Sequence, residues 1–357
     1  MDFDLTKDQK LIQSSVREFL GKECPPDRVR EMDQDEKGMD PDLWKRIAEL
    51  GWMGIPFPEE YGGTGGDFLD LMIVMEELGY FAVPGPFFST VVLGGLALMN
   101  AGTEEQKRFF LPKLIDGEIF LTMALTEPSV LYDASGVHVS ALPDKGGYVI
   151  DGTKLFVPDA QIANYILCVA RTKESADPEE GITVFIIDTG VEGLTCRPLP
   201  NITREKQGEV ILEQVHVSGN DILGKKDEGW GIVEDVLGIA AVARCTEMVG
   251  GARAAMDLAL SYAKKRVQFD RPIGSFQAVQ QTFADMWINI NGCRNLVYKA
   301  AWKVAKGEKA SKEAAMAKAR TGKVYRNVTT MAHQIFGAIG FTQEHDMHLY
   351  YLSLIHI

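Results

Sequence analysis

Hydrophobic residues in the first third of the chain recur at the spacing of α-helices. Thr6 and Gln9 have the spacing of a capping box, and an apolar helical face follows them. Further helical patterns occupy residues 43–50, 68–78, 89–99 and 104–115, with glycine and proline clusters between them. The pattern predicts an N-terminal helical domain over residues 1–117.

After Gly117 the pattern changes to short runs of β-branched and aromatic residues. These runs lie at residues 137–141, 148–150, 155–157, 165–170, 182–187 and 210–217. Turn signals such as Gly146-Gly147 and Asp151-Gly152 separate them, which is typical of strands joined by tight turns. We therefore expect a middle β domain over residues 118–222, folded as an antiparallel β-barrel or sandwich.

Long helical patterns return from Gly229 onward, at residues 232–264, 278–306 and 312–336. The first is apolar on nearly all sides between Val236 and Val249, so most of it should be buried between neighbouring helices. The pattern predicts a C-terminal helical bundle over residues 223–351. The fold class is therefore a multidomain α and β protein, with helical, β and helical domains in that order.

Composition and charge narrow the class of protein. Hydrophobic residues make up 46% and charged residues 24%, and no run of about 18 apolar residues predicts a membrane span. A net charge of −13 opposes binding to nucleic acid. The N-terminus lacks the pattern of a secretory signal, and the five cysteines are scattered without metal-ligand spacing. We therefore expect a cytoplasmic protein without a metal site.

Several short phrases occur together in a characteristic order. They are PEEYGG at residues 58–63, EQK at 105–107, LTEP at 125–128, DGTK at 151–154, RVQF at 266–269, FQ at 276–277 and QIFGAIGF at 334–341. Each phrase alone is weak evidence, but their order resembles that of the acyl-CoA dehydrogenase family along essentially the whole chain. The same order of helical, β and helical domains belongs to that family.

The resemblance implies an FAD site. By it, Leu125 and Thr126 contact the flavin ring with backbone and hydroxyl, Phe156 covers the ring, and Arg266 contacts the pyrophosphate, which suits forked guanidinium donors. The other residues implied near the pyrophosphate and adenosine are Phe269, Gln277, Gln334 and Gly337. Gln334 would come from a neighbouring subunit, so the resemblance implies a dimer at least. Without it, Arg266 could equally end a helix and Phe156 could be a core aromatic.

The resemblance also implies an activity and partners. In the family, a carboxylate removes the α-proton of an acyl-CoA thioester while the β-hydrogen passes to the flavin as hydride, which leaves a trans-2-enoyl-CoA. The electrons then pass to an electron-transfer flavoprotein. An acyl-CoA substrate, an electron-transfer flavoprotein and a homo-oligomer or a heteromer with a related subunit are the implied partners.

Some positions depart from the family pattern. Leu131 and Tyr132 stand where most relatives have a Gly-Ser pair near the flavin, and Pro158 stands where a threonine hydroxyl usually donates to the flavin. Ala240 occupies the position at which one branch of the family carries its glutamate base. These changes leave two alternatives open: a non-catalytic subunit that completes FAD binding for a partner, or an acyl-CoA oxidase or flavin monooxygenase of the same superfamily.

Glu247 is the best remaining candidate for the base. It lies seven residues, or about two helical turns, after Ala240. The competing interpretation is an ordinary ion pair with Arg244 at i,i+3. The other branch of the family places its base in the C-terminal segment, and residues 352–357 resemble a non-native tail, so we also expect a C-terminal truncation.

Overall fold

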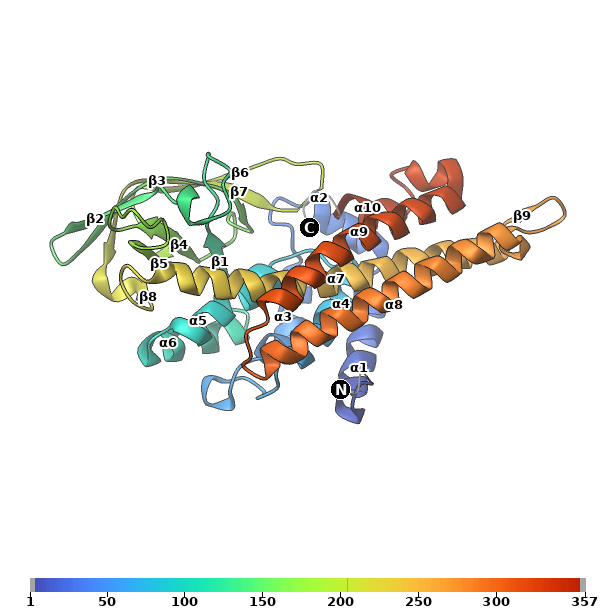
Figure 1. Cartoon of the computed structure of the whole chain (residues 1–357), viewed down its shortest axis with the longest axis horizontal. Helices are drawn as coiled ribbons and strands as arrows, with labels where there is room; N and C mark the ends of the chain where they lie inside the picture. Colours follow the sequence, from blue (N-terminus) through green and yellow to red (C-terminus); the bar gives the residue numbers. More distant parts are fainter. Residues whose placement is uncertain (1–3, 204, 354–357) are drawn as a thin grey trace.

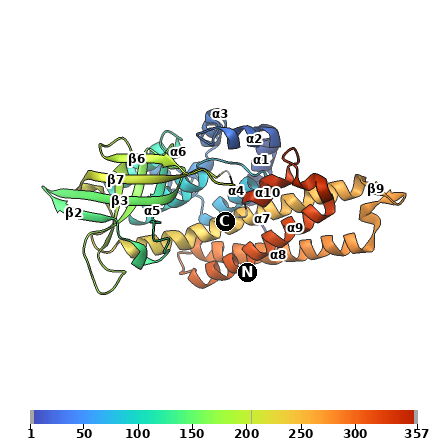
Figure 2. The same cartoon turned by 90° about the horizontal axis from the view of Figure 1, so that it is seen from above.

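The N-terminal part of the chain is helical, as predicted. The computed structural model describes residues 4–203 and 205–353, and Figures 1 and 2 show their arrangement. The α-helices of this part are α1 (Lys7–Glu23), α2 (Pro26–Gln34), α3 (Pro41–Glu49), α4 (Phe68–Tyr80), α5 (Leu96–Ala101) and α6 (Glu104–Ile115). The predicted capping box is confirmed, because the Gln9 N–H donates to Thr6 Oγ1 at 3.2 Å and the Thr6 N–H donates to Gln9 Oε1 at 3.1 Å.

The predicted helix at residues 89–99 takes a different form. It begins as the π-helix η3 (Phe88–Gly95) and continues as α5. At Gly94 an added Cβ would lie 2.4 Å from the Leu121 side chain, so a close approach to the following strand requires glycine there. Wide π-type turns inside helices often accompany functional sites. Helix α2 was not predicted, because its nine residues are too few and too polar to give a clear apolar period.

The middle part is a β-sheet, as predicted, but the sheet is mixed. Its strands are β1 (Leu121–Ala124), β2 (Ser140–Asp144), β3 (Gly147–Pro158), β4 (Tyr165–Arg171), β5 (Ile182–Asp188), β6 (Leu194–Pro198), β7 (Gln207–Ser218) and β8 (Ile222–Leu223). The order is β6-β7-β3-β2-β4-β5-β8, with β1 also paired to β4. The β1–β4 and β2–β4 pairings are parallel and the others antiparallel. Two predicted runs, 148–150 and 155–157, form the single long strand β3, whose pairing with β7 is interrupted by bulges.

The C-terminal part contains three long helices that lie side by side (Figures 1 and 2). Its elements are α7 (Gly229–Lys265), β9 (Val267–Gln268), β10 (Arg271–Pro272), α8 (Gln277–Ala305), α9 (Ser311–Phe336), η7 (Gly337–Phe341) and α10 (Met347–Ser353). Helix α7 packs against α4, α8 and α9, which confirms that its apolar middle is buried. Within the described part of the chain, no helix is long and apolar enough to cross a membrane.

Two glycines bring α4 and α7 into direct backbone contact. A Cβ added to Gly250 of α7 would lie 1.9 Å from the Glu76 carbonyl oxygen of α4, and one added to Gly79 of α4 would lie 2.2 Å from the Glu247 carbonyl oxygen. Any side chain at these positions would push the helices apart. The crossing therefore fixes the turn of α7 that carries Glu247 against the N-terminal helices.

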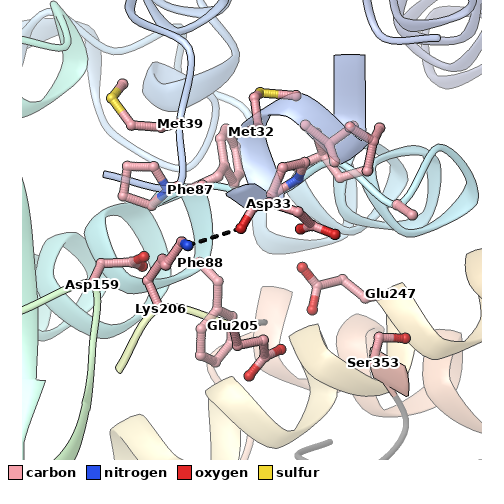
Figure 3. Close-up of a pocket in the computed structure, with 18 of the residues that line it drawn as sticks. Met32, Asp33, Met39, Phe87, Phe88, Asp159, Glu205, Lys206, Glu247 and Ser353 are labelled. Atoms are coloured by element: carbon pink, nitrogen blue, oxygen red, sulfur yellow. Dashed lines mark hydrogen bonds between the residues drawn. The ribbon is translucent and has the colours of Figure 1, made fainter. Parts of the chain in front are cut away.

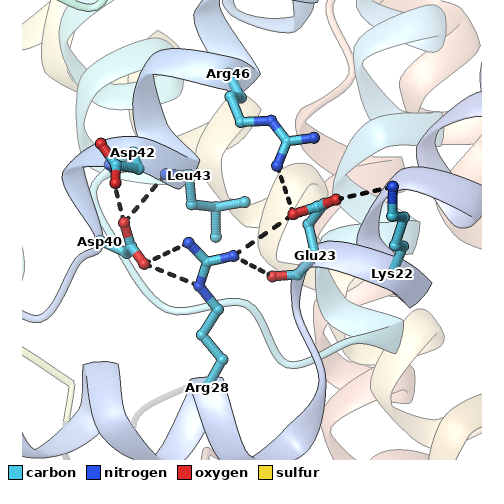
Figure 4. A network of polar contacts seen from close by, with 7 residues as sticks. All are labelled: Lys22, Glu23, Arg28, Asp40, Asp42, Leu43 and Arg46. Atoms are coloured by element: carbon cyan, nitrogen blue, oxygen red, sulfur yellow. Dashed lines mark hydrogen bonds and ion pairs between the residues drawn. The ribbon is translucent and has the colours of Figure 1, made fainter.

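A polar network ties α1, α2 and α3 together (Figure 4). Arg28 donates to Asp40 Oδ2 at 2.8 Å and 2.5 Å and to the Glu23 carbonyl oxygen at 2.6 Å, and Arg46 also donates to Glu23. Asp40 caps α3 through its other oxygen, which accepts the backbone N–H groups of Asp42 and Leu43. The network fixes the loop between α2 and α3, which forms one wall of the cavity described next.

Candidate active site

A cavity of about 160 Å³ lies where the three parts of the chain meet (Figure 3). Its walls come from the α2–α3 loop, the start of η3, the end of β3, the loop before β7, the middle of α7 and the end of α10. Apolar side chains such as Met32, Met39, Phe87 and Phe88 line one part of it. The rest of the lining is unusually rich in charge, which burial makes costly unless the charges are paired.

Glu247 and Arg244 face this cavity from α7. Arg244 donates to Glu247 Oε2 at 2.8 Å, so the i,i+3 pair considered from the sequence is present. The same guanidinium lies 3.8 Å from the Glu205 carboxylate and 3.7 Å from the centre of the Phe88 ring. Burial lowers the pKa of Arg244, but Glu247 and Glu205 raise it by more. Burial raises the pKa of Glu247, and Arg244 offsets only part of that rise.

Asp159 faces the cavity from the end of β3, and Figure 3 shows it across the cavity from Glu247. Its carboxylate Oδ2 lies 2.5 Å from the Ser89 hydroxyl of η3. Burial raises the pKa of Asp159 to about 6, although Ser89 and Arg244 act in the opposite direction. No sequence pattern indicated Asp159, because a single aspartate after a strand is usually a turn residue.

The three residues implied at the flavin ring lie on and beside β3. Phe156 is 44% exposed and has a φ of +55° in the bulged part of the strand, so it is not a core aromatic. The Thr126 carbonyl oxygen accepts the Leu155 N–H at 2.8 Å, which places the segment of Leu125 and Thr126 against β3. Pro158, two residues after Phe156, lines the cavity. Of this segment, Pro158 is thus the residue that reaches the cavity.

A buried ion pair supports this segment. Lys154 Nζ donates to Glu127 Oε1 at 2.6 Å and to the Leu125 carbonyl oxygen at 3.1 Å. Glu127 also accepts the N–H groups of His138 and Val139. Lys154 is fully buried, and Glu127 is 3% exposed. Both residues belong to phrases that carried the family resemblance, but the sequence did not show that they contact each other.

The residues implied at the pyrophosphate and adenosine lie elsewhere. Arg266 is the C-cap of α7, Phe269 lies in the β9–β10 turn and is 87% exposed, and Gln277 begins α8. Gln334 and Gly337 lie at the end of α9, which packs on the end of α7 through Tyr262 and Phe336 at a ring separation of 4.9 Å. The structure therefore gathers these five residues at one end of the C-terminal helices.

This end is far from the cavity. Arg244 at the cavity and Arg266 are 22 positions apart along α7, which at 1.5 Å per residue is about 33 Å. Figure 1 shows the β9 end of the helices pointing away from the β-sheet. The two groups of residues therefore lie at separate places in one chain.

The residues beside β3 have side chains that suit a flavin ring, and the residues at the end of α7 have side chains that suit a pyrophosphate and an adenosine. Gly337 has a φ of +68°, and an added Cβ would meet only open space, which leaves its backbone accessible. Within the described residues, no ion pair involves the Arg266 guanidinium, so this exposed cation is available for a phosphate. Phe156 and Phe269 present aromatic surface that the chain's own core does not cover.

Comparison with known proteins agrees with this architecture. Three acyl-CoA dehydrogenase family models match the chain: the N-terminal domain at residues 6–118, the middle domain at 122–215 and the C-terminal domain at 227–354. The chain is 35% identical over 353 residues to the probable acyl-CoA dehydrogenase YngJ of Bacillus subtilis, which covers 97% of this chain and 92% of the relative. The chain therefore belongs to the acyl-CoA dehydrogenase family.

Two further relatives are informative. The structure of butyryl-CoA dehydrogenase from Megasphaera elsdenii superposes with a TM-score of 0.93 at 32% identity, covering 99% of this chain and 94% of that one. The caffeyl-CoA reductase-Etf complex subunit CarC of Acetobacterium woodii is 31% identical over 356 residues, covering 97% of this chain and 92% of the relative. These matches confirm the predicted family and the order of its domains.

The expected C-terminal truncation is not borne out. The C-terminal family model matches residues 227–354, and with the other two models it covers nearly all of the chain. Leu352 and Ser353 belong to α10, and the Ser353 hydroxyl lies 2.9 Å from that of Tyr325. The other residues of the predicted non-native tail, 354–357, lie outside the described part of the chain.

Proposed function

We propose that this protein is an FAD-dependent acyl-CoA dehydrogenase that converts an acyl-CoA thioester to a trans-2-enoyl-CoA. One observation carries the proposal: a cavity has the end of the flavin-side strand β3, with Asp159 directly after it, on one side and the carboxylate of Glu247 on the other. An acyl chain between them would present its β-hydrogen to the flavin and its α-proton to the base. Anaerobic mixing with short acyl-CoA esters tests this, because the bound flavin should lose its colour.

In this proposal the protein positions the substrate and takes the proton. FAD supplies the hydride acceptor when it is bound. Glu247 accepts the α-proton, a role helped by burial because its raised pKa makes it a stronger base than an exposed glutamate. Arg244 holds this carboxylate in place through the bond of 2.8 Å. The apolar wall that includes Phe87 and Phe88 excludes water from the reacting carbons.

We propose FAD rather than FMN because the residues at the far end of α7 suit a pyrophosphate and an adenosine. Replacing Arg266 by alanine should weaken FAD retention by about 1.5–3 kcal/mol, the scale of a hydrogen bond to a charged group. The measurement is flavin loss during equilibrium dialysis of the purified variant. Lys264→Ala, which removes another exposed cation of the same helix end, is the matched control and should retain FAD as the unmodified protein does.

Because the two groups of residues lie far apart in one chain, we propose that the active form contains at least two subunits. Residues at the α7 end of one subunit would complete the flavin site of another. The partner is proposed to be a second copy or a related subunit. Dilution below the dissociation constant of the subunits should release flavin and subunits together, as followed by flavin fluorescence and light scattering. Flavin retained by a monomer would contradict this arrangement.

The sequence departures support one alternative, a subunit that completes FAD binding for a related catalytic partner. Pro158 has no N–H or hydroxyl to offer the flavin, and Ala240 provides no base. Co-purification with a related subunit would favour this alternative, especially if only the mixture reduces its flavin with acyl-CoA. A homo-oligomer that is saturated with flavin and reduced by acyl-CoA would contradict it.

For the main proposal, the electron acceptor is an electron-transfer flavoprotein, a choice supported by the Etf complex named for the CarC relative.

A further inference from the structure

The cavity has one polar feature that the proposed reaction does not use, the pair of Asp159 and Ser89. Ser89 is fully buried in the π-helix η3. The Asp159 backbone holds its side chain toward the cavity with a φ of +52°, and its N–H donates to the Lys206 carbonyl oxygen at 2.9 Å. An aspartate tolerates such a φ better than most residues, but the conformation still has a cost that local contacts must offset.

The hydrogen bonds around Ser89 show which protonation state of Asp159 satisfies both contacts of the Ser89 hydroxyl. Ser89 Oγ lies 3.1 Å from the Pro86 carbonyl oxygen and 2.5 Å from Asp159 Oδ2. Both partners are acceptors when Asp159 is ionised, but a hydroxyl has only one proton to donate. If Asp159 is protonated, it donates to Ser89 Oγ and Ser89 donates to Pro86, so both contacts become hydrogen bonds. The geometry therefore favours the neutral acid, in agreement with the raised pKa of Asp159.

The neutral acid lies among charged groups that already have partners. The other acidic and basic side chains that line the cavity are Asp33, Asp40, Glu205, Lys206, Arg244 and Glu247. Asp40 is paired with Arg28, Lys206 donates to the Asp33 carbonyl oxygen at 3.0 Å, and Arg244 is held by Glu247 and Glu205. An anionic acyl group would meet an excess of carboxylates here, whereas a neutral hydroxyl can both accept and donate.

Asp159 Oδ1 has no hydrogen-bond partner among the described residues, so a plain alkyl chain packed against it would leave this oxygen without a bond. Each group left without a bond costs about 1–3 kcal/mol. A site built to bond a substrate hydroxyl discriminates strongly against the analogue that lacks it, for the same reason. The small volume of the cavity, about 160 Å³, further favours a short acyl group.

We propose that Asp159, supported by Ser89, is a specificity-determining residue that selects a short acyl group carrying a neutral hydroxyl over the matching unsubstituted chain. This inference rests on the proposed function, since it takes the cavity to be the acyl site. The Asp159 carboxyl touches the substrate substituent and takes no part in the transfer of hydrogen. The selected substrates are short hydroxyacyl-CoA thioesters.

The test compares butanoyl-CoA with 4-hydroxybutanoyl-CoA in the unmodified protein and two variants. Asp159→Asn keeps the shape, and its NH₂ group can donate to Ser89 as the neutral acid does. Asp159→Leu keeps a similar size without polarity. The ratio of kcat/KM should favour the hydroxylated ester by about ten- to a hundredfold in the unmodified protein and in Asp159→Asn, on the scale of one lost hydrogen bond. Asp159→Leu should remove or reverse this preference.

Calorimetric binding of the same two esters separates this inference from the proposed function. Failure of both esters to reduce the flavin would count against the proposed function alone. Equal binding of the two esters to the unmodified protein would overturn the inference, whatever the turnover. A preference that persists in Asp159→Leu would overturn it as well, because the selection would then come from other residues.

The protonation state has its own readout. The pKa of Asp159 is about 6 in the folded protein, against about 3.9 for an unfolded aspartate. Between these values the folded state binds the extra proton, so the stability of the unmodified protein relative to Asp159→Asn should fall as pH rises from about 4 to about 6 and then stay level. Equilibrium unfolding at a series of pH values measures this difference. A difference that grows with rising pH would mean an ionised Asp159 and would overturn the assignment of a neutral acid.

Discussion

Replacing Glu247 by glutamine is expected to slow flavin reduction by acyl-CoA by about 100- to 10,000-fold, the range that a positioned general base contributes. Glutamine keeps the size of the side chain, and its amide oxygen can still accept the hydrogen bond that Arg244 donates to Glu247 Oε2 at 2.8 Å. The change therefore removes the base while leaving the helix packing in place. Rapid mixing without oxygen, followed at the flavin absorbance, measures the rate directly.

The pH dependence of the same rate gives a second readout. Because burial raises the pKa of Glu247 by more than Arg244 lowers it, the reactive carboxylate forms only above the ordinary glutamate value of about 4.3. The rate in the unmodified protein should therefore rise with pH through that raised value. In the Glu247→Gln variant this rise should be absent from whatever activity remains.

Glu205→Gln is the matched control for this experiment. Glu205 lies 3.8 Å from the same guanidinium and lines the same cavity, but it comes from the loop before β7. We expect its replacement to change the rate much less than the replacement of Glu247. If Glu247→Gln reduces its flavin at the parent rate, the base is another group and the assignment of Glu247 is wrong.

Replacing Lys154 by methionine is expected to lower the free energy of unfolding by about 3–5 kcal/mol, the usual cost of breaking a buried ion pair from one side. Methionine keeps the length of the side chain but leaves the buried Glu127 carboxylate with only the backbone donors of His138 and Val139. The Leu125 carbonyl oxygen also loses its donor. Denaturant unfolding followed by circular dichroism measures the change.

The double variant Glu127→Gln with Lys154→Met is the control. It removes both charges, so most of the lost stability should return. FAD retention should remain reduced in both variants if the ion pair also positions the segment of Leu125 and Thr126 for the flavin. If the Lys154→Met variant is as stable as the unmodified protein, the ion pair between Lys154 Nζ and Glu127 Oε1, 2.6 Å apart here, does not form in solution.

The sequence predicted some parts of the fold correctly and others not. Long amphipathic patterns predicted the long helices correctly, because many residues contribute to one period. The mixed pairing of the sheet was missed, since β1 pairs in parallel with β4 although some forty residues separate them in sequence, and such pairing depends on how the chain crosses over. The π-helix was also missed, because its wide turn depends on how Gly94 approaches Leu121.

In the candidate site, too, the sequence indicated some residues and missed others. The family phrases indicated Phe156, Arg266 and Gln334, but no local pattern indicated Asp159. Its importance comes from Ser89, which lies 70 positions earlier and reaches it at 2.5 Å. Hydrogen bonds between residues far apart in sequence leave no periodic signal.

The sequence by itself determined the family, the order of helical, β and helical domains, and the residue types that suit a flavin and a pyrophosphate. It did so because these features are recorded locally, in short phrases and in regular apolar spacing. Only the tertiary structure decided that Glu247, Arg244 and Asp159 share one cavity, and that Arg266 lies about 33 Å from it along α7. The physical reason is that burial and pairing of charges depend on how the helices cross, and here that crossing is fixed by the contact of Gly79 and Gly250 between α4 and α7.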